Sequence, residues 1–179
     1  MEPGGRDSRS LFSSRTLLDF VLLTALGARA VLSEHTTQGF VSPVDPFLAA
    51  AADAAIAAAE SQLLHPRCET IFSDFHEPSG APLRAALDRL GVSGGAFLRS
   101  LKYANGEHLP LCEPGVLAGT RTGGRVIYLC GSRFVSAQRS NPRLGAALIL
   151  HEALHALGLS ENPPTSLQIT AGVLGKCGR

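Results

Sequence analysis

Two histidines and a glutamate near the end of the chain have the spacing with the clearest chemical meaning. His151, Glu152 and His155 lie in the string His-Glu-Ala-Leu-His. Residues four apart lie one above the other on the same face of an α-helix, so both imidazoles can bind one zinc ion. Glu152 then lies beside the ion, where a carboxylate can act as a general base toward water.

The segment around these residues is predicted to be a buried helix. From residue 144 to residue 159, all residues except His151, Glu152 and His155 are apolar or glycine. A helix that is apolar all round is normally buried, and polar side chains in it must be paired or bound to metal. Asn141 as N-cap, Pro142 in the first position and Gly158 as a stop predict a helix over about 142–157. The alternative is a pair of hydrogen-bonded core histidines with a buried glutamate salt bridge.

Two imidazoles need a third protein ligand to make a catalytic zinc site. After Glu161 the chain has no Asp, Glu or His, and the only later donor of a suitable type is Cys177. Gly158 lets the chain turn after the helix, which favours Glu161 as the third ligand. The alternative for Glu161 is an ordinary solvated loop acid. Less favoured upstream ligands are Glu107, His108 and Glu113.

The segment His151–Glu161 resembles the active-site helix of zincin metallopeptidases. Its two histidines match the metal ligands of that family, Glu152 matches the general base, and Gly158 matches the turn glycine of the metzincin pattern. Metzincins generally have His, sometimes Asp, at the position of Glu161, and they place a methionine turn beneath the metal. The only methionine here is Met1. Gluzincins take a Glu ligand from a separate downstream helix, where this chain has no acidic residue.

The resemblance implies one bound Zn²⁺, a peptide or protein substrate, and hydrolysis of peptide bonds by metal-activated water with Glu152 as the base. The wider stretch over residues 128–166 resembles small bacterial zincin-like proteins, and this likeness implies no particular substrate. Tyr128 and Arg133 are candidates to stabilise the oxyanion, with packing in a strand as the alternative for Tyr128. A strand over 125–130 is expected to pair with an extended substrate.

A second function remains open, in which the protein is a zinc-stabilised binding or scaffold domain without turnover. A structural site has a closed fourth position and does not need a carboxylate beside the metal, so Glu152 favours the hydrolase. A third possibility is a zincin that has lost activity and binds a partner through the former substrate cleft.

Composition bounds the class of protein. The chain has 179 residues, 45% of them hydrophobic and 17% charged, with a formal net charge of +1. These values predict a globular chain with a single core. No basic cluster with interleaved aromatic residues is present, so a nucleic-acid partner is not expected.

The N-terminus resembles a secretory signal. Three arginines precede an apolar run over residues 17–27, and Ala28-Arg29-Ala30 resembles a cleavage site, although Asp19 interrupts the run. The uncharged stretch 20–28 is shorter than the ~20 residues of a membrane span, so no stable span is expected. We therefore predict a signal over 1–30, a linker over 31–44 and one zincin-like domain over 45–179. The expected location is secreted or periplasmic, with a cytoplasmic chain bearing an N-terminal extension as the alternative.

The four cysteines support the same location. They are widely spaced and even in number, which is typical of two disulfides in an oxidising compartment. Three pairings are possible, and a bridge between Cys130 and Cys177 is one guess, because it would close the metal region. Buried thiols in a cytosolic protein are the alternative. The four residues are Cys68, Cys112, Cys130 and Cys177.

The remaining pattern predicts an α+β fold, in which a small mixed sheet or hairpin packs on the active-site helix with additional helices. An alanine-rich segment from Phe47 to Leu64 is expected to be helical. Further helices are expected over 82–90 and from a capping box at Thr165 to about residue 174. Strands over 115–120 and 125–130 are expected to form a hairpin around Gly123-Gly124. Residues 71–80 are expected to be irregular, 93–95 a flexible break, and 97–103 either a strand or a short helix.

Overall fold

The fold is built around one buried helix that lies between a long helix and a small sheet. The computed structural model describes residues 45–178; the expected signal and linker lie outside them. The helices are α1 (Pro46–Leu63), α2 (Pro66–Glu69), α3 (Ile71–Asp74), α4 (Leu83–Leu90), α5 (Gly94–Ser100), α6 (Gly131–Ser140), α7 (Pro142–Leu157) and α8 (Ser166–Cys177). The strands are β1 (Lys102–Asn105), β2 (Ala118–Thr120) and β3 (Val126–Leu129). This mixture confirms the predicted α+β class.

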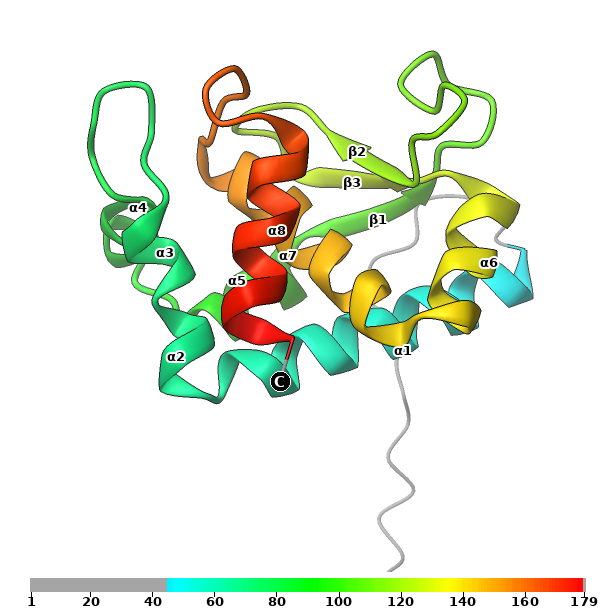
Figure 1. Cartoon of the computed structure of the whole chain (residues 1–179), viewed down its shortest axis with the longest axis horizontal. Coiled ribbons are helices and arrows are strands. Elements are labelled where there is room, and N and C mark those ends of the chain that lie inside the picture. The colour runs from blue at the N-terminus through cyan, green and yellow to red at the C-terminus, as the bar shows by residue number, and fades with distance from the viewer. Residues whose placement is uncertain (1–44, 179) are drawn as a thin grey trace, which may run out of the picture. The chain divides into compact units, whose positions relative to one another are not determined.

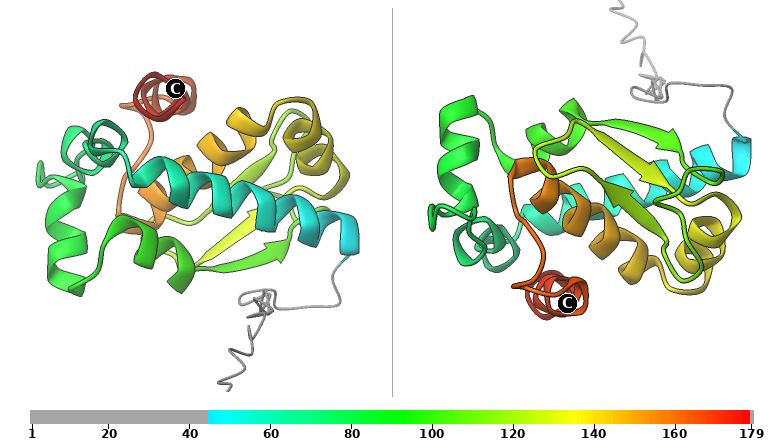
Figure 2. Two further views of the ribbon diagram at one scale, coloured as in Figure 1. Left: turned by 90° about the horizontal axis from the view of Figure 1, so that it is seen from below. Right: turned by 90° about the horizontal axis from the view of Figure 1, so that it is seen from above.

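The sheet has the order β1-β3-β2, so β3 is its central strand. Strand β1 pairs with β3 in parallel, and β2 pairs with β3 in antiparallel fashion, which confirms the predicted hairpin. Ile127 and Leu129 are fully buried, whereas Val126 and Tyr128, which alternate with them, are half-buried. This alternation means that one face of the sheet packs on the helices. Figures 1 and 2 show α7 between that face and α1.

Helix α7 begins and ends where the sequence predicts. The Asn141 side chain accepts a hydrogen bond from the Leu144 N–H at 3.2 Å, Pro142 is the first helical residue, and Gly158 ends the helix. Twelve of its sixteen residues are buried, as expected for a helix that is apolar all round. On one side α1 packs against it through small side chains, because Ala52, Ala55 and Ala59 are all fully buried.

Two predictions for the middle of the chain were wrong. Residues 71–74, expected to be irregular, form the short helix α3 directly after α2, whereas residues 75–80 lie in no helix or strand, as expected. The supposed flexible break at residues 93–95 is the start of α5, where the Ser93 side chain accepts a hydrogen bond from the Ala96 N–H. The ambiguous segment after it contains both α5 and β1. Helix α6 was not predicted.

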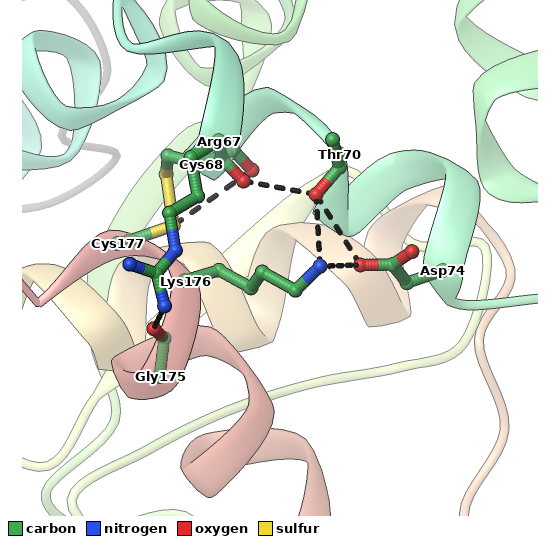
Figure 3. The surroundings of a disulfide bond; sticks show 7 residues. All are labelled: Arg67, Cys68, Thr70, Asp74, Gly175, Lys176 and Cys177. Atoms are coloured by element: carbon green, nitrogen blue, oxygen red, sulfur yellow. Dashed lines mark hydrogen bonds and ion pairs between the residues drawn. A yellow bond between two sulfur atoms is a disulfide. The ribbon is translucent and has the colours of Figure 1, made fainter.

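Two disulfides are present, but the guessed bridge between Cys130 and Cys177 is wrong. Cys112 pairs with Cys130, which joins the loop after β1 to the end of β3. Cys177 pairs with Cys68, which joins the end of α8 to α2 (Figure 3). The sequence predicted two disulfides, but the pairing of the four cysteines depends on which of them lie close together in the folded chain. Two disulfides fit an oxidising location.

Membrane-spanning potential is limited among the described residues. None of their helices alone combines the length and the apolarity needed to cross a bilayer. The segments Pro46–Leu63 and Pro66–Asp74 meet both criteria only together, and the chain bends by 98° between them.

Gly94 gives a test of the packing around α5. A Cβ added there would lie 2.4 Å from Cε2 of the buried Phe72 ring, so Gly94→Ala forces the ring or the helix to move. Overpacking of this kind lowers the free energy of unfolding by about 1–3 kcal/mol, which urea denaturation measures. Gly95→Ala is the matched control, because its Cβ would contact only Arg99 at 3.9 Å. Equal stability of the two variants would contradict this packing.

Candidate metal centre

Helix α7 places His151 and His155 one turn apart with their ring Nε2 atoms 3.0 Å from each other. Both residues are buried, with 3% and 7% exposed. The chain turns at Gly158, whose φ of +123° strongly favours glycine, and returns Glu161 to the two rings. Its Oε1 lies 3.3 Å from Nε2 of His155 and 3.8 Å from Nε2 of His151. These three side chains form the one group of potential metal ligands within residues 45–178.

The distances within this group suit a single small cation. Two ligand atoms bound to one tetrahedral zinc at about 2.0–2.1 Å lie about 3.3 Å apart. The three edges of the group measure 3.0, 3.3 and 3.8 Å, so a shift of a few tenths of an ångström brings each to that value. Two imidazoles and one carboxylate are also a typical ligand set for catalytic zinc.

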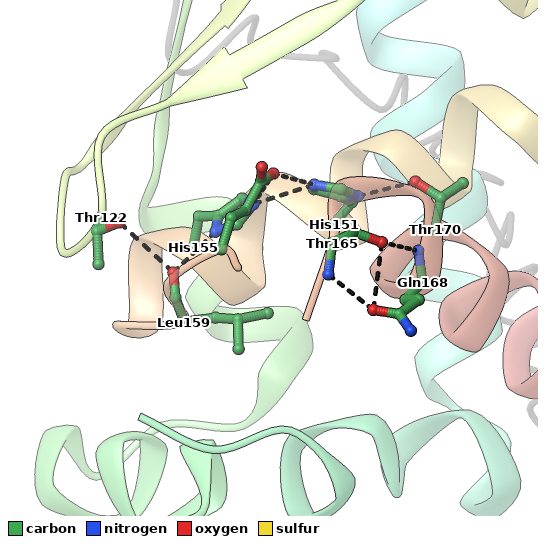
Figure 4. A network of polar contacts seen from close by, with 8 residues as sticks. Thr122, His151, His155, Leu159, Thr165, Gln168 and Thr170 are labelled. Atoms are coloured by element: carbon green, nitrogen blue, oxygen red, sulfur yellow. Dashed lines mark hydrogen bonds and ion pairs between the residues drawn. The ribbon is translucent and has the colours of Figure 1, made fainter. Parts of the chain in front are cut away.

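Hydrogen bonds on the far side of each ring orient the two histidines. Nδ1 of His155 lies 2.8 Å from the Leu159 carbonyl oxygen, and Nδ1 of His151 lies 2.9 Å from Oγ1 of Thr170 (Figure 4). A carbonyl only accepts, so Nδ1 of His155 carries a proton, and in the neutral ring the free lone pair is then on Nε2. Metal-binding histidines usually have such a partner on the second ring nitrogen. The donor set therefore fits a cation.

Burial shifts the pKa values of His151 and Glu152. Burial is the larger cause and repulsion from the nearby His155 the smaller cause that together lower the pKa of His151 to about 4. This imidazole is therefore neutral at physiological pH and able to bind metal. Burial is the larger cause and repulsion from Glu161 the smaller cause that raise the pKa of Glu152 to about 8. The hydrogen bond from the Thr120 backbone N–H lowers this pKa in part. A cation next to Glu152 would favour its carboxylate form.

One side of the group opens to the surface through a pocket of about 430 Å³. His151, Glu152, His155 and Glu161 all line it, so the proposed base and the three potential ligands share one space. The Glu161 side chain is 38% exposed, so the group is accessible to solvent on this side. Strand β2 forms the opposite wall with Ala118, Gly119 and Thr120, and Val116, Thr122 and Ser166 complete the lining.

Comparisons of the chain with protein-family models, curated proteins and solved structures find no match.

Tyr128 and Arg133 do not join this pocket. Tyr128 lies on β3 with its neighbours Ile127 and Leu129 directed into the core, so its side chain is on the other face of the sheet. It lines a different pocket with Leu111. The Arg133 guanidinium donates hydrogen bonds to the carbonyls of Cys112 and Glu113.

The less favoured upstream ligands also lie elsewhere. Glu107 accepts a hydrogen bond from the Ser132 hydroxyl, and His108 and Glu113 are exposed. None of the three belongs to the ligand group. The strand expected to pair with substrate, β3, is central and has both edges paired. The edge strand that faces the histidines is β2.

Sequence reasoning missed the groups that orient the histidines. The Leu159 carbonyl is a backbone group, which no residue type marks. Thr170 is a single half-buried hydroxyl next to the buried Ile169 of α8. Its polar character beside an apolar stripe was the available signal, but only the packing of α8 on α7 shows that it reaches His151.

Removal of Glu161 tests the ligand group. Glu161→Ala leaves two imidazoles, so zinc affinity should fall by more than the ~10–100-fold typical of changes outside the ligand set. Competition with a chromogenic chelator measures the dissociation constant. Glu113→Ala is the control, because Glu113 is an exposed acid outside the group. Wild-type affinity in Glu161→Ala would remove this residue from the ligand set.

Proposed function

We propose that the protein is a zinc-dependent peptidase that hydrolyses peptide bonds with Glu152 as general base. The observation that carries the proposal is the shared pocket, in which a buried carboxylate lies next to two oriented imidazoles and a half-exposed acid. A structural metal site would need a closed ligand sphere and would have no use for Glu152. The proposal rests on this geometry and on the zincin resemblance of residues 151–161.

Each residue has a defined task in the proposed reaction. His151, His155 and Glu161 would hold the ion, which supplies polarisation of the substrate carbonyl and a lowered pKa of water. Glu152 accepts the proton of the attacking water and then delivers it to the leaving amine, so the carboxylate is regenerated. Its burial keeps its carboxyl out of bulk water, and this strengthens its interaction with charges in the pocket.

Strand β2 supports a peptide as the substrate. Its pairing with β3 leaves its other edge without a strand partner among the described residues, and residues 118–120 of that strand line the pocket. An extended peptide can pair with such an edge through its backbone. Its scissile bond would then lie beside the histidines. The two disulfides further favour secretion or export to the periplasm as part of this proposal.

A zinc-stabilised binding domain is the second candidate, and one observation favours it. Among the described residues that line the pocket there is no arginine, lysine or tyrosine to stabilise an oxyanion. Zinc alone, or the backbone and threonine groups of the loop after β2, would have to perform that task. A protein that binds zinc tightly but cleaves no peptide would favour this candidate.

Glu152→Gln tests the proposed function. The substitution keeps the shape of the side chain but removes the base, so peptide hydrolysis should fall by at least ~10²-fold while zinc stoichiometry stays at wild type. Cleavage of a fluorogenic peptide library by zinc-loaded protein measures the rate, and elemental analysis measures the metal.

Glu113→Gln is the matched control for the change from carboxylate to amide, and it should retain wild-type hydrolysis. Wild-type hydrolysis by Glu152→Gln would show that this carboxylate is not the base. Absence of cleavage by the zinc-loaded wild type across the library would favour the binding domain.

A further inference from the structure

Helix α8 lies beside α7, and one hydroxyl of α8 contacts His151 of the ligand group. Oγ1 of Thr170 lies 2.9 Å from Nδ1 of His151, across 19 residues of sequence (Figure 4). Thr170 is half-buried, whereas Ile169 and Val173 of the same helix are fully buried. The hydroxyl therefore meets His151 at the boundary between the core and the pocket.

This contact is compatible with the tautomer of His151 in which Nε2 is free to bind a cation. The hydroxyl of threonine can accept a hydrogen bond from Nδ1–H. With the proton on Nδ1, the Nε2 atom keeps its lone pair and faces Nε2 of His155 and the carboxylate of Glu161. Without a partner at Nδ1, the ring of His151 is free to rotate about its side-chain bonds or to place its proton on Nε2. Either change removes the lone pair from the ligand group.

The end of α8 is fixed to another part of the fold, far along the chain. Cys177 forms its disulfide with Cys68, and the Arg67 side chain donates a hydrogen bond to the Gly175 carbonyl at 2.9 Å (Figure 3). Lys176 forms an ion pair with Asp74 at 2.9 Å. At the start of α8, the capping box of Thr165 and Gln168 closes the first turn. The C-terminal end of α8 is thus fixed to α2 and α3, and this limits how far Thr170 can shift relative to His151.

We propose that Thr170 is a positioning residue that holds the His151 imidazole in its metal-binding orientation, with α8 and its disulfide as the rigid support. The inference rests on the zinc site of the proposed function, but it does not require that the site be catalytic. Thr170 contacts neither the bound ion nor a substrate in this assignment. It acts through the ring of His151.

Thr170→Val tests the role of the hydroxyl. Valine has nearly the same shape but cannot accept a hydrogen bond, so the zinc dissociation constant should rise by about 10–100-fold. Competition with a chromogenic chelator at neutral pH measures it. Thr170→Ser restores a hydroxyl and should return the constant close to that of the wild type. The absorption bands of bound Co²⁺ should shift in the valine variant and return in the serine variant.

Thr165→Val is the matched control for stability. It removes the N-cap hydroxyl of α8, five residues away, and leaves Thr170 intact. Its melting temperature should fall, while its zinc affinity should stay close to wild type. If Thr165→Val weakens zinc binding as much as Thr170→Val, general loosening of α8 explains the effect and the proposal is overturned. Thr170→Ala provides the same comparison if the valine variant does not fold.

Two further outcomes separate this inference from the proposed function. Wild-type zinc affinity in Thr170→Val would overturn the positioning role and leave the zinc site and the peptidase proposal intact. Failure of the wild-type protein to bind zinc would overturn both. Loss of affinity in Thr170→Val together with rescue by serine supports the positioning role whether or not any peptide is cleaved.

Discussion

Burial of His151, Glu152 and His155 in α7 places three polar side chains where water cannot fully solvate them. The two Nδ1 atoms find partners in Thr170 and in the Leu159 carbonyl. Those bonds leave the two Nε2 atoms 3.0 Å apart and next to Glu161. Two lone pairs at this distance repel each other. The arrangement of the two rings therefore requires a proton or a cation between the Nε2 atoms.

Several features of the fold serve the same group. The turn at Gly158 brings both the Leu159 carbonyl and Glu161 back to the histidines. Helix α1 covers the other side of α7 with alanines, so the polar face of α7 can meet the pocket while its apolar face is packed. Strand β2 forms the far wall of that pocket. The group of potential ligands therefore lies between the helical core and the edge strand β2.

The elements with strong local signals could be predicted from the sequence, and those set by distant contacts could not. Asn141, Pro142 and Gly158 bound α7 correctly, because caps and helix breakers act locally. Glu161 was favoured by elimination and by the turn before it. The cysteine pairing failed because Cys68 and Cys177 are 109 residues apart and meet only through the packing of α8. Tyr128 was a poor candidate because the alternation along β3 leaves open which face meets α7. Thr170 could not be identified before α8 was placed.

X-ray absorption at the zinc edge of the purified, zinc-loaded protein tests the central claim most directly, because it reports the ligand atoms without requiring activity. The account predicts a first shell of nitrogen and oxygen at about 2.0–2.1 Å, with the outer-shell scattering of two imidazoles and no sulfur. The imidazole scattering should disappear in the double variant His151→Ala/His155→Ala. A shell containing sulfur, a single imidazole, or a spectrum unchanged in the double variant would contradict a cation held by these two rings.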